Sequence, residues 1–303
     1  MSGCSGSSAP TLEAYLGSVS GRFEAAELFY GHGTDNAWDE AVYLVFTALG
    51  IGFDSDSEVM HRSLTPAEVE AIERLVERRI RQRVPVAYLV GEAWFAGLRF
   101  RVDERVLIPR SPLAELILQR FATLVPEDPG RILDLCTGSG CIGIACAVAF
   151  PGASVDLSDI SAPALALARE NIELHGLGAR VQGIESDLFG ALEDCRYDLI
   201  ISNPPYVSRE EIEELPPEYL REPELGLLSD DDGLAIPLRI MREAPQHLNA
   251  EGVLIVEVGY SREALEQRLP GVPFTWLEFA CGGDGVFLFT RKQLLAFREH
   301  FGT

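Results

Sequence analysis

The chain has no long apolar run and no leader-like beginning. It contains no stretch of about eighteen uninterrupted apolar residues, which is near the length that a membrane-spanning helix needs. Its opening Met-Ser-Gly-Cys-Ser-Gly-Ser-Ser has no cationic region followed by an apolar one, as a secretory signal would have. We therefore expect a cytoplasmic protein with no membrane association.

Positive charge is scarce. Against 47 Asp and Glu residues stand 25 Lys and Arg residues, so the formal net charge is -22. Phosphate backbones are bound by Lys and Arg, so we expect no direct DNA binding and instead favour a basic protein partner. The acidic excess is concentrated between Glu210 and Asp232. This segment is either a solubilising loop or an electrostatic binding surface for a cationic protein substrate.

Metal-binding patterns are also missing. The 6 cysteines include no Cys-x-x-Cys pair, and no His stands where it would complete a zinc site. We expect reduced, mostly buried thiols and no metal.

The length of 303 residues suggests one large domain or two unequal ones. From Leu12 to about Val90 the apolar spacing is helical, and the alternation over 94–108 predicts a β-hairpin. We predict a helical substrate-recognition domain over residues 1–93, with about the first eleven disordered. A hairpin linker over 94–108 and a catalytic domain over 109–303 follow.

One predicted helix carries the basic cluster of the chain. Thr65-Pro66-Ala67-Glu68 supplies an N-cap, a proline at the first helical position and an acidic first turn. A solvated helix face is favoured for the arginines over a contact site for RNA or an acidic surface. These arginines are Arg74, Arg78, Arg79, Arg81 and Arg83.

After Gly130 strands alternate with helices. Strands are predicted over 131–136, 154–159, 180–186, 197–203, 252–259, 274–280 and 285–291, and helices near 141–150, 163–175, 234–248 and 262–269. This pattern predicts an α/β fold with a mostly parallel, Rossmann-like sheet of seven strands covered on both faces. Its ligand site should lie at the carboxyl ends of the strands, and the last two strands should be antiparallel.

The first predicted strand ends in a glycine turn, Thr137-Gly138-Ser139-Gly140. Glycines there let the backbone approach a ligand closely, and the sequence through Gly143 formally fits a dinucleotide fingerprint. Asp134 near the end of the strand suits an ammonium group better than a pyrophosphate.

The next two strand ends are acidic as well. Asp159, followed by Ile160, is placed to accept hydrogen bonds from both hydroxyls of a ribose. Asp187 could accept from an adenine amino group, with Leu188 or Phe189 packing on the ring. Each acid alone could be a helix N-cap, but suitable polar groups at four consecutive strand ends favour one ligand site.

The fourth strand ends in Asn203-Pro204-Pro205-Tyr206. Two prolines stiffen the segment and remove N–H donors. The Asn side-chain oxygen and a backbone carbonyl can each accept one hydrogen of a planar NH2 group, while the aromatic ring covers its face.

In the residues of these four strand ends, the chain resembles class I S-adenosylmethionine-dependent methyltransferases that methylate amino groups. More closely, it resembles the HemK-like protein glutamine N5-methyltransferases, in which a hairpin joins a small helical domain to the catalytic domain. The resemblance covers nearly the whole chain after Leu12. Within the family, 108–116 and 134–141 are similar to the branch that methylates ribosomal protein L-three. Release-factor enzymes usually carry Gly where Cys136 stands and a different tetrad after Arg110, which disfavours release-factor specificity.

The resemblance implies a methyl donor, S-adenosylmethionine, with S-adenosylhomocysteine as product. It implies a basic large-subunit ribosomal protein as substrate, met before or during assembly. The expected catalytic residues are Asn203, Pro204 and Tyr206, and those expected to bind substrate are Asn203, Pro204, Pro205, Tyr206 and Arg110. The expected cofactor residues are Asp134, Thr137, Gly138, Ser139, Gly140, Asp159, Ile160, Asp187, Leu188 and Asn203.

Other functions remain open. Adenine-N6 methylation of nucleic acid would use the same grip, but it needs a basic groove and a recognition region for a flipped base. Methylation of peptide release factors is a second alternative, and a non-catalytic ribosome-assembly factor is a third. A nicotinamide oxidoreductase is disfavoured, because no catalytic Tyr-Lys or His pair follows the second strand.

Overall fold

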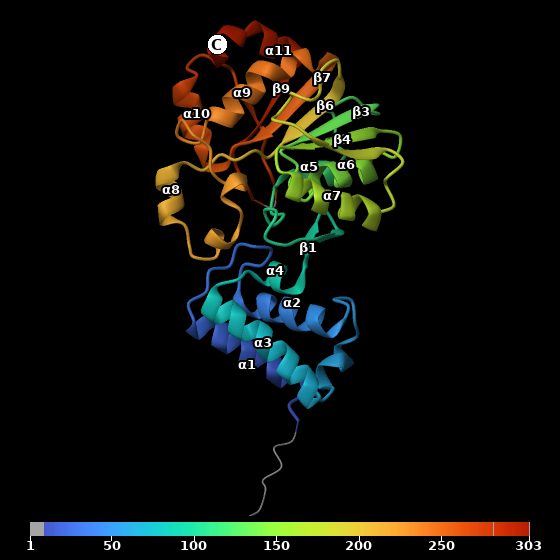
Figure 1. The fold of residues 1–303 in the computed structure, drawn as a ribbon, viewed down its shortest axis with the longest axis vertical. Helices are drawn as coiled ribbons and strands as arrows, with labels where there is room; N and C mark the ends of the chain where they lie inside the picture. The colour runs from blue at the N-terminus through green and yellow to red at the C-terminus, as the bar shows by residue number, and fades with distance from the viewer. Residues whose placement is uncertain (1–8, 281, 303) are drawn as a thin grey trace, which may run out of the picture. The chain divides into compact units, whose positions relative to one another are not determined.

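The computed structural model describes residues 9–280 and 282–302, and the chain forms two compact units (Figure 1). The helical unit comprises the chain up to Glu92 together with Pro216–Arg221. The α/β unit comprises Ala93–Leu215 and the chain from Glu222 onward. Most of the segment expected to be disordered lies outside the described residues, but Pro10 is ordered, since its carbonyl accepts from the Leu64 N–H at 2.9 Å.

The helical unit is a small bundle whose helices begin at good N-caps. Its elements are α1 (Leu12–Ala25), α2 (Ala37–Leu49), η1 (Ser57–His61), α3 (Pro66–Gln82), α4 (Val86–Val90) and η2 (Tyr219–Arg221). Thr11, Asn36 and Thr65 cap α1, α2 and α3, and Thr65 forms the predicted capping box with Glu68. Helix α2 packs against α1, α3 and α4.

A fully buried arginine organises this bundle. Arg79 of α3 donates to Glu40 at 3.1 Å, to Glu218 at 3.0 Å and to the Phe29 carbonyl at 2.8 Å. Arg83 reaches Glu218 as well, at 3.3 Å. The expectation of a solvated or contact face is therefore wrong for Arg79, because its charge is matched inside the unit.

Burial raises the pKa of Glu40 to about 7, although Arg79 opposes the shift. Burial acts the same way on Glu218, but there the hydrogen bond and charge of Arg79, together with the backbone N–H groups of Glu218 and Phe29, outweigh burial and lower the pKa. Glu218 is thus the main counter-ion of Arg79, and it ties the segment Pro216–Arg221 into the helical unit.

The α/β unit contains a seven-stranded sheet of order β5-β4-β3-β6-β7-β9-β8. Its strands are β3 (Arg131–Leu135), β4 (Ser154–Asp159), β5 (Val181–Glu185), β6 (Tyr197–Ser202), β7 (Leu248–Glu257), β8 (Thr275–Trp276) and β9 (Val286–Thr290). The helices are α5 (Leu113–Leu118), α6 (Cys141–Ala149), α7 (Ala162–Leu174), α8 (Arg209–Glu214), α9 (Ala235–Glu243), α10 (Arg262–Arg268) and α11 (Arg291–Ala296). The five strands β5, β4, β3, β6 and β7 are parallel, and β9 is antiparallel to both β7 and β8. The predicted fold class is therefore confirmed.

Successive strand residues face two separate cores. Ile132 and Leu199 belong to the core that includes residues of α5, α6 and α7, whereas Leu133 and Ile200 belong to the core that includes residues of α9 and α11. Figure 1 shows these two groups of helices on opposite faces of the sheet. Both faces are covered, as a parallel sheet requires.

Several elements differ from the predictions. Where the hairpin was predicted over 94–108, a two-stranded sheet of β1 (Glu92–Phe95) and β2 (Leu98–Arg101) begins earlier and ends well before residue 108. The predicted strand over 274–280 shrinks to Thr275–Trp276, because it is an edge strand that pairs with β9 alone. The helix predicted to reach residue 248 ends at Glu243, since Pro245 cannot continue the helical hydrogen bonds. Helix α8 lies in the acidic segment, where no helix was predicted.

Across residues 9–280 and 282–302, none of the helices combines the length and the apolarity that crossing a bilayer requires.

The buried network in the helical unit predicts a large loss of stability in R79M. Methionine leaves the buried Glu40 and Glu218 without their shared cation, so the free energy of unfolding should fall by about 3–5 kcal/mol. Urea unfolding followed by far-ultraviolet circular dichroism measures the change. The matched control is R78M, because Arg78 is the preceding residue of α3 and is exposed. Its effect should stay within about 0.5 kcal/mol, and equal losses in both variants would contradict a structural role for the Arg79 network.

Candidate functional site

A cavity in the α/β unit lies at the carboxyl ends of four neighbouring strands, β5, β4, β3 and β6. Parallel strands end at the same edge of a sheet, so residues far apart in the sequence meet there. The lining residues from these strand ends are Cys136, Gly138, Ser158, Asp159, Ile160, Ser186, Asp187, Leu188, Asn203 and Pro205.

The predicted site residues divide between this lining and the surrounding layer. The cavity brings together Gly138, Asp159, Ile160, Asp187, Leu188, Asn203 and Pro205. The residues outside its lining are Asp134, Thr137, Ser139, Gly140, Pro204, Tyr206 and Arg110.

The turn after β3 reverses direction through left-handed backbone. Cys136, Gly138 and Gly140 have φ of +61°, +55° and +81°, a region that glycine adopts without a steric penalty. A Cβ on Gly143, one turn into α6, would come within 2.2 Å of the Leu157 side chain. Glycine at these positions therefore allows both the tight turn and the close packing of α6, and Cys136 is a strained non-glycine residue on the cavity wall.

Asp134 holds this turn from inside the protein. The side chain is fully buried, and its Oδ2 accepts from the Thr137 hydroxyl and from the Gly143 N–H at 2.8 Å. Its Oδ1 has no hydrogen-bond partner among the described residues, and burial raises the pKa of Asp134 to about 7. A buried acceptor without a donor needs an explanation, and a donor from a bound group would supply one.

Asp159 joins the turn after β3 to the cavity. Its Oδ2 accepts from the Gly138 N–H and its Oδ1 from the Ser161 N–H, both at 2.8 Å. Burial raises the pKa of Asp159 although these backbone donors lower it. Ser161, and not Asp159, is the N-cap of α7. A carboxylate offers about four lone pairs, so acceptor capacity remains for a ligand.

Asp187 has a partner that the sequence pattern did not indicate. Arg239 of α9 donates to its Oδ1 at 2.6 Å, while more than half of the Asp187 side chain stays exposed. The next residue, Leu188, has φ of +49° and is buried against the cavity. This strand end therefore presents one apolar side chain and one ion-paired carboxylate.

The Asn203–Tyr206 segment is held in place by its backbone. Asn203 and Pro205 line the cavity, and Pro204 is buried. The carbonyl of Tyr206 accepts from the Ser261 hydroxyl at 2.8 Å, and a Cβ on Gly233 would lie only 2.2 Å from the same oxygen.

Arg110 binds a carboxylate of the chain itself. It donates to both carboxylate oxygens of Glu222, at 2.6 and 2.7 Å, and Glu222 also accepts from the Ile108 N–H at 2.9 Å. The side chain of Glu222 is fully buried. Part of the acidic segment therefore satisfies internal cations and backbone donors, whereas α8 keeps Glu210, Glu213 and Glu214 exposed.

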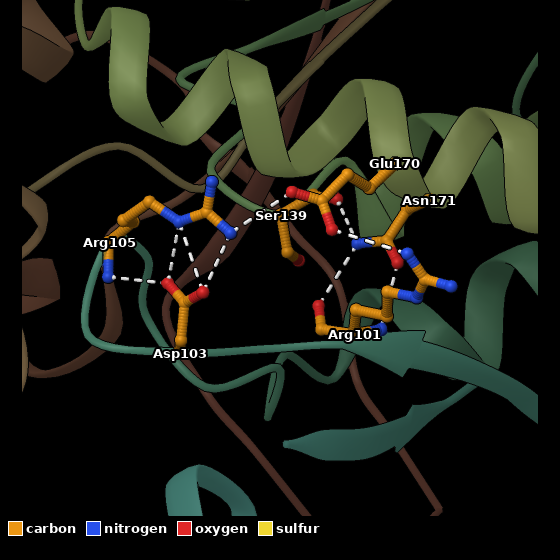
Figure 2. A network of polar contacts seen from close by, with 6 residues as sticks. All are labelled: Arg101, Asp103, Arg105, Ser139, Glu170 and Asn171. Carbon is orange, nitrogen blue, oxygen red and sulfur yellow. Dashed lines mark hydrogen bonds and ion pairs between the residues drawn. The ribbon is translucent and has the colours of Figure 1, made fainter.

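A second wall of the cavity comes from the residues after β2, and the sequence did not indicate it. Asn171 of α7 is fully buried and binds both the N–H and the carbonyl of Arg101, and it donates to the Ser139 carbonyl at 2.9 Å (Figure 2). Arg105, which lines the cavity, donates to Glu170 of α7 at 3.2 Å. The only signal available was a polar Asn171 on the apolar face of a predicted helix.

Over residues 9–280 and 282–302, no group of three or more His, Cys, Asp or Glu side chains is placed to hold a metal ion.

Comparisons with known proteins bear on both units. Residues 23–91 match the model of the PrmC N-terminal domain, and residues 114–217 match that of the methyltransferase small domain. A solved methyltransferase from Pyrococcus furiosus aligns with 75% of this chain and 99% of its own length, at 15% identity and a TM-score of 0.47.

Two curated relatives are more similar. Both are named ribosomal protein uL3 glutamine methyltransferase. The protein from Francisella tularensis is 46% identical over 96% of this chain and 93% of its own length. The protein from Xylella fastidiosa is 50% identical over 92% of this chain and 89% of its own length. Together with the strand-end cavity and its glycine turn, these identities show that the chain belongs to the family of ribosomal protein uL3 glutamine methyltransferases.

Proposed function

We propose that this chain transfers a methyl group from S-adenosylmethionine to the side-chain amide nitrogen of a glutamine in ribosomal protein uL3. The main observation behind the proposal is that four strand ends meet at one cavity. Asn203 and Pro205 line this cavity after the fourth of these strands, β6. The names of both relatives support the same reaction.

Residues of the cavity lining and of the layer behind it fit the methyl donor. Asp159 keeps lone pairs for two ribose hydroxyls, and the side chains of Ile160 and Leu188 offer apolar contact to an adenine ring. The unpartnered Oδ1 of Asp134 suits an ammonium group, which would also compensate its buried charge. In this proposal Thr137, which binds Asp134, shapes the turn without facing the cavity.

The Asn203 side-chain oxygen and the Pro204 carbonyl accept the two hydrogens of the substrate amide. This grip orients the nitrogen lone pair, which is otherwise delocalised into the amide carbonyl. When bound, S-adenosylmethionine supplies a methyl group on cationic sulfur: a nitrogen–carbon bond forms, the carbon–sulfur bond breaks and one amide hydrogen leaves as a proton. Both acceptors bind more strongly as positive charge develops on the nitrogen, so they stabilise the transition state more than the ground state.

In this proposal Pro205 forms the wall of the cavity beside the amide, and the ring of Tyr206, which lies next to that lining, covers the planar amide once the substrate is bound. The net charge of -22 and the exposed glutamates of α8 favour a basic substrate protein, met before or during ribosome assembly.

Substrate choice is the first test. Purified chain with radiolabelled S-adenosylmethionine should label purified uL3 on a glutamine, identified by mass spectrometry, and should leave peptide release factor and DNA unlabelled. Labelling of release factor alone would show that release factor, and not uL3, is the substrate. Labelling of DNA alone would overturn protein methylation. Binding of uL3 without any transfer would instead support an assembly factor.

Asn203 should matter for the rate and not for folding. N203A removes one of the two acceptors, so kcat should fall by about 10²- to 10³-fold while the thermal unfolding midpoint changes little. N249A is the matched control, because Asn249 lies near the start of β7, at the opposite edge of the same sheet, and bonds Asp198. Its kcat should remain within twofold of the wild type, and an equal loss in both variants would argue against the proposed grip.

Asp159 should control cofactor affinity. D159N weakens the charged acceptor, so the Kd for S-adenosylhomocysteine, measured by calorimetry, should rise by about 10- to 100-fold. D198N is the control, since Asp198 also accepts two backbone N–H groups, from Gly130 at 2.8 Å and Arg131 at 3.0 Å, but at the other edge of the sheet. A Kd that is unchanged in D159N would remove Asp159 from the cofactor site.

A further inference from the structure

Beside the Asn203–Tyr206 segment lies a buried carboxylate that the proposed reaction does not use. Glu257 is the last residue of β7, and its side chain is buried. In the parallel register Ser202 of β6 pairs with Val256 of β7, so Glu257 stands at the level of Asn203. A charged side chain in this position was not indicated by any motif in the sequence.

Both carboxylate oxygens of Glu257 face hydroxyl groups. Oε2 makes a short hydrogen bond with the hydroxyl of Ser111, and Oε1 lies 3.5 Å from the hydroxyl of Tyr206. The Ser111 Oγ in turn accepts from the Leu113 N–H at 3.1 Å, so the Ser111 hydrogen is directed to Glu257. Glu257 therefore links the start of α5 to the tyrosine of the Asn-Pro-Pro-Tyr segment.

The Tyr206 ring has little freedom to move. Gly259 has φ of +47°, and a Cβ there would lie 2.8 and 2.9 Å from two ring carbons of Tyr206 and 3.0 Å from its hydroxyl oxygen. Ser261 holds the Tyr206 carbonyl at 2.8 Å. Glycine at position 259 thus lets the backbone after β7 lie against the ring. Ser261 holds the main chain of Tyr206, and Glu257 contacts the hydroxyl at the far end of the ring.

Arg110, the residue before Ser111, also binds a buried carboxylate near the cavity. Arg110 binds Glu222, and the cavity wall formed by Pro223, Leu225 and Gly226 begins at the next residue. Two adjacent side chains, Arg110 and Ser111, therefore each bind a buried carboxylate. One of these carboxylates supports the cavity wall, and the other supports Tyr206.

We infer that Glu257 is a positioning residue for methyl transfer, which holds the Tyr206 ring, and with it the neighbouring amide acceptors, in the reactive arrangement. The inference rests on the proposed function. A displacement of about 1 Å at such a site can cost about 10²-fold in rate, so a contact outside the cavity lining can still govern kcat. Cofactor binding, which uses the other strand ends, should not depend on it.

The protonation of Glu257 supplies a readout that packing alone would not give. The groups facing it are the Ser111 hydroxyl and the Arg110 cation from residues 109–112, the Tyr206 hydroxyl from the segment that follows β6, and the apolar Val286 from β9. Burial raises the pKa of Glu257 to about 7, against the lowering effect of Ser111 and Arg110. Only the ionised carboxylate accepts from both hydroxyls, so kcat should rise with pH through about 7.

The experiment compares E257Q, S111A and Y206F with the wild type. Labelled methyl transfer to uL3 gives kcat and KM across pH 5.5–9, roughly one to two units either side of the group's pKa, and calorimetry gives the Kd for S-adenosylhomocysteine. We expect a 10- to 100-fold loss of kcat in E257Q, smaller losses in S111A and Y206F, and a Kd within twofold of the wild type. The rise near pH 7 should disappear in E257Q. The double variant E257Q/Y206F should be no slower than E257Q, because both changes break the same contact.

E40Q is the matched control, since Glu40 is a buried glutamate of the helical unit whose pKa is also about 7. It should retain the rise of kcat with pH. If E257Q does not fold, Y206F, which keeps the carboxylate and the ring, decides the question by its kcat and pH profile. Variants that match the wild type in kcat and pH profile while the wild type methylates uL3 would overturn this inference alone. A wild type that does not methylate uL3 would overturn the proposed function and this inference together.

Discussion

The parallel direction of β5, β4, β3 and β6 sets both the layout of the α/β unit and the place of its candidate site. Because these strands are parallel, each carboxyl end reaches the same edge of the sheet, and each following segment starts there. The glycine turn, Asp159, Asp187 and Asn203 are separated by long stretches of sequence, yet they border one cavity. The helices that connect the strands also cover the sheet, so the same arrangement builds the core and the site.

Buried carboxylates organise the residues around this cavity. Asp134 and Asp159 accept backbone N–H groups that define the turn after β3. Glu222 and Glu257 accept from Arg110 and Ser111. A carboxylate can accept several hydrogen bonds at once, so one side chain can fix two or three segments. The acidity of this chain is therefore partly structural and is not only a property of its surface.

The acidic segment illustrates this division of roles. Glu218 belongs to the helical unit, where it balances Arg79, and Glu222 belongs to the α/β unit, where it binds Arg110. After Leu215 the chain therefore passes from the α/β unit to the helical unit, and at Glu222 it returns to the α/β unit. Each of the two units holds one of these buried ion pairs. The glutamates Glu210, Glu213 and Glu214 of α8 stay exposed and have no such internal role.

The alternation of strands and helices, the glycine turn, the Thr65 cap and the polar strand ends could all be predicted from the amino-acid sequence, because periodicity and caps are set by neighbouring residues. It also indicated the family through the Asn-Pro-Pro-Tyr segment and the residues around Arg110 and Asp134. Which side chains meet in space could be seen only in the folded chain. Asp187 pairs with Arg239, 52 positions away, Arg110 with Glu222, 112 away, and Ser111 with Glu257, 146 away. Such pairs depend on strand order and on the path of the loops in space, so no local pattern could specify them, and the same reason explains why Arg79 was expected on a surface and lies in a core.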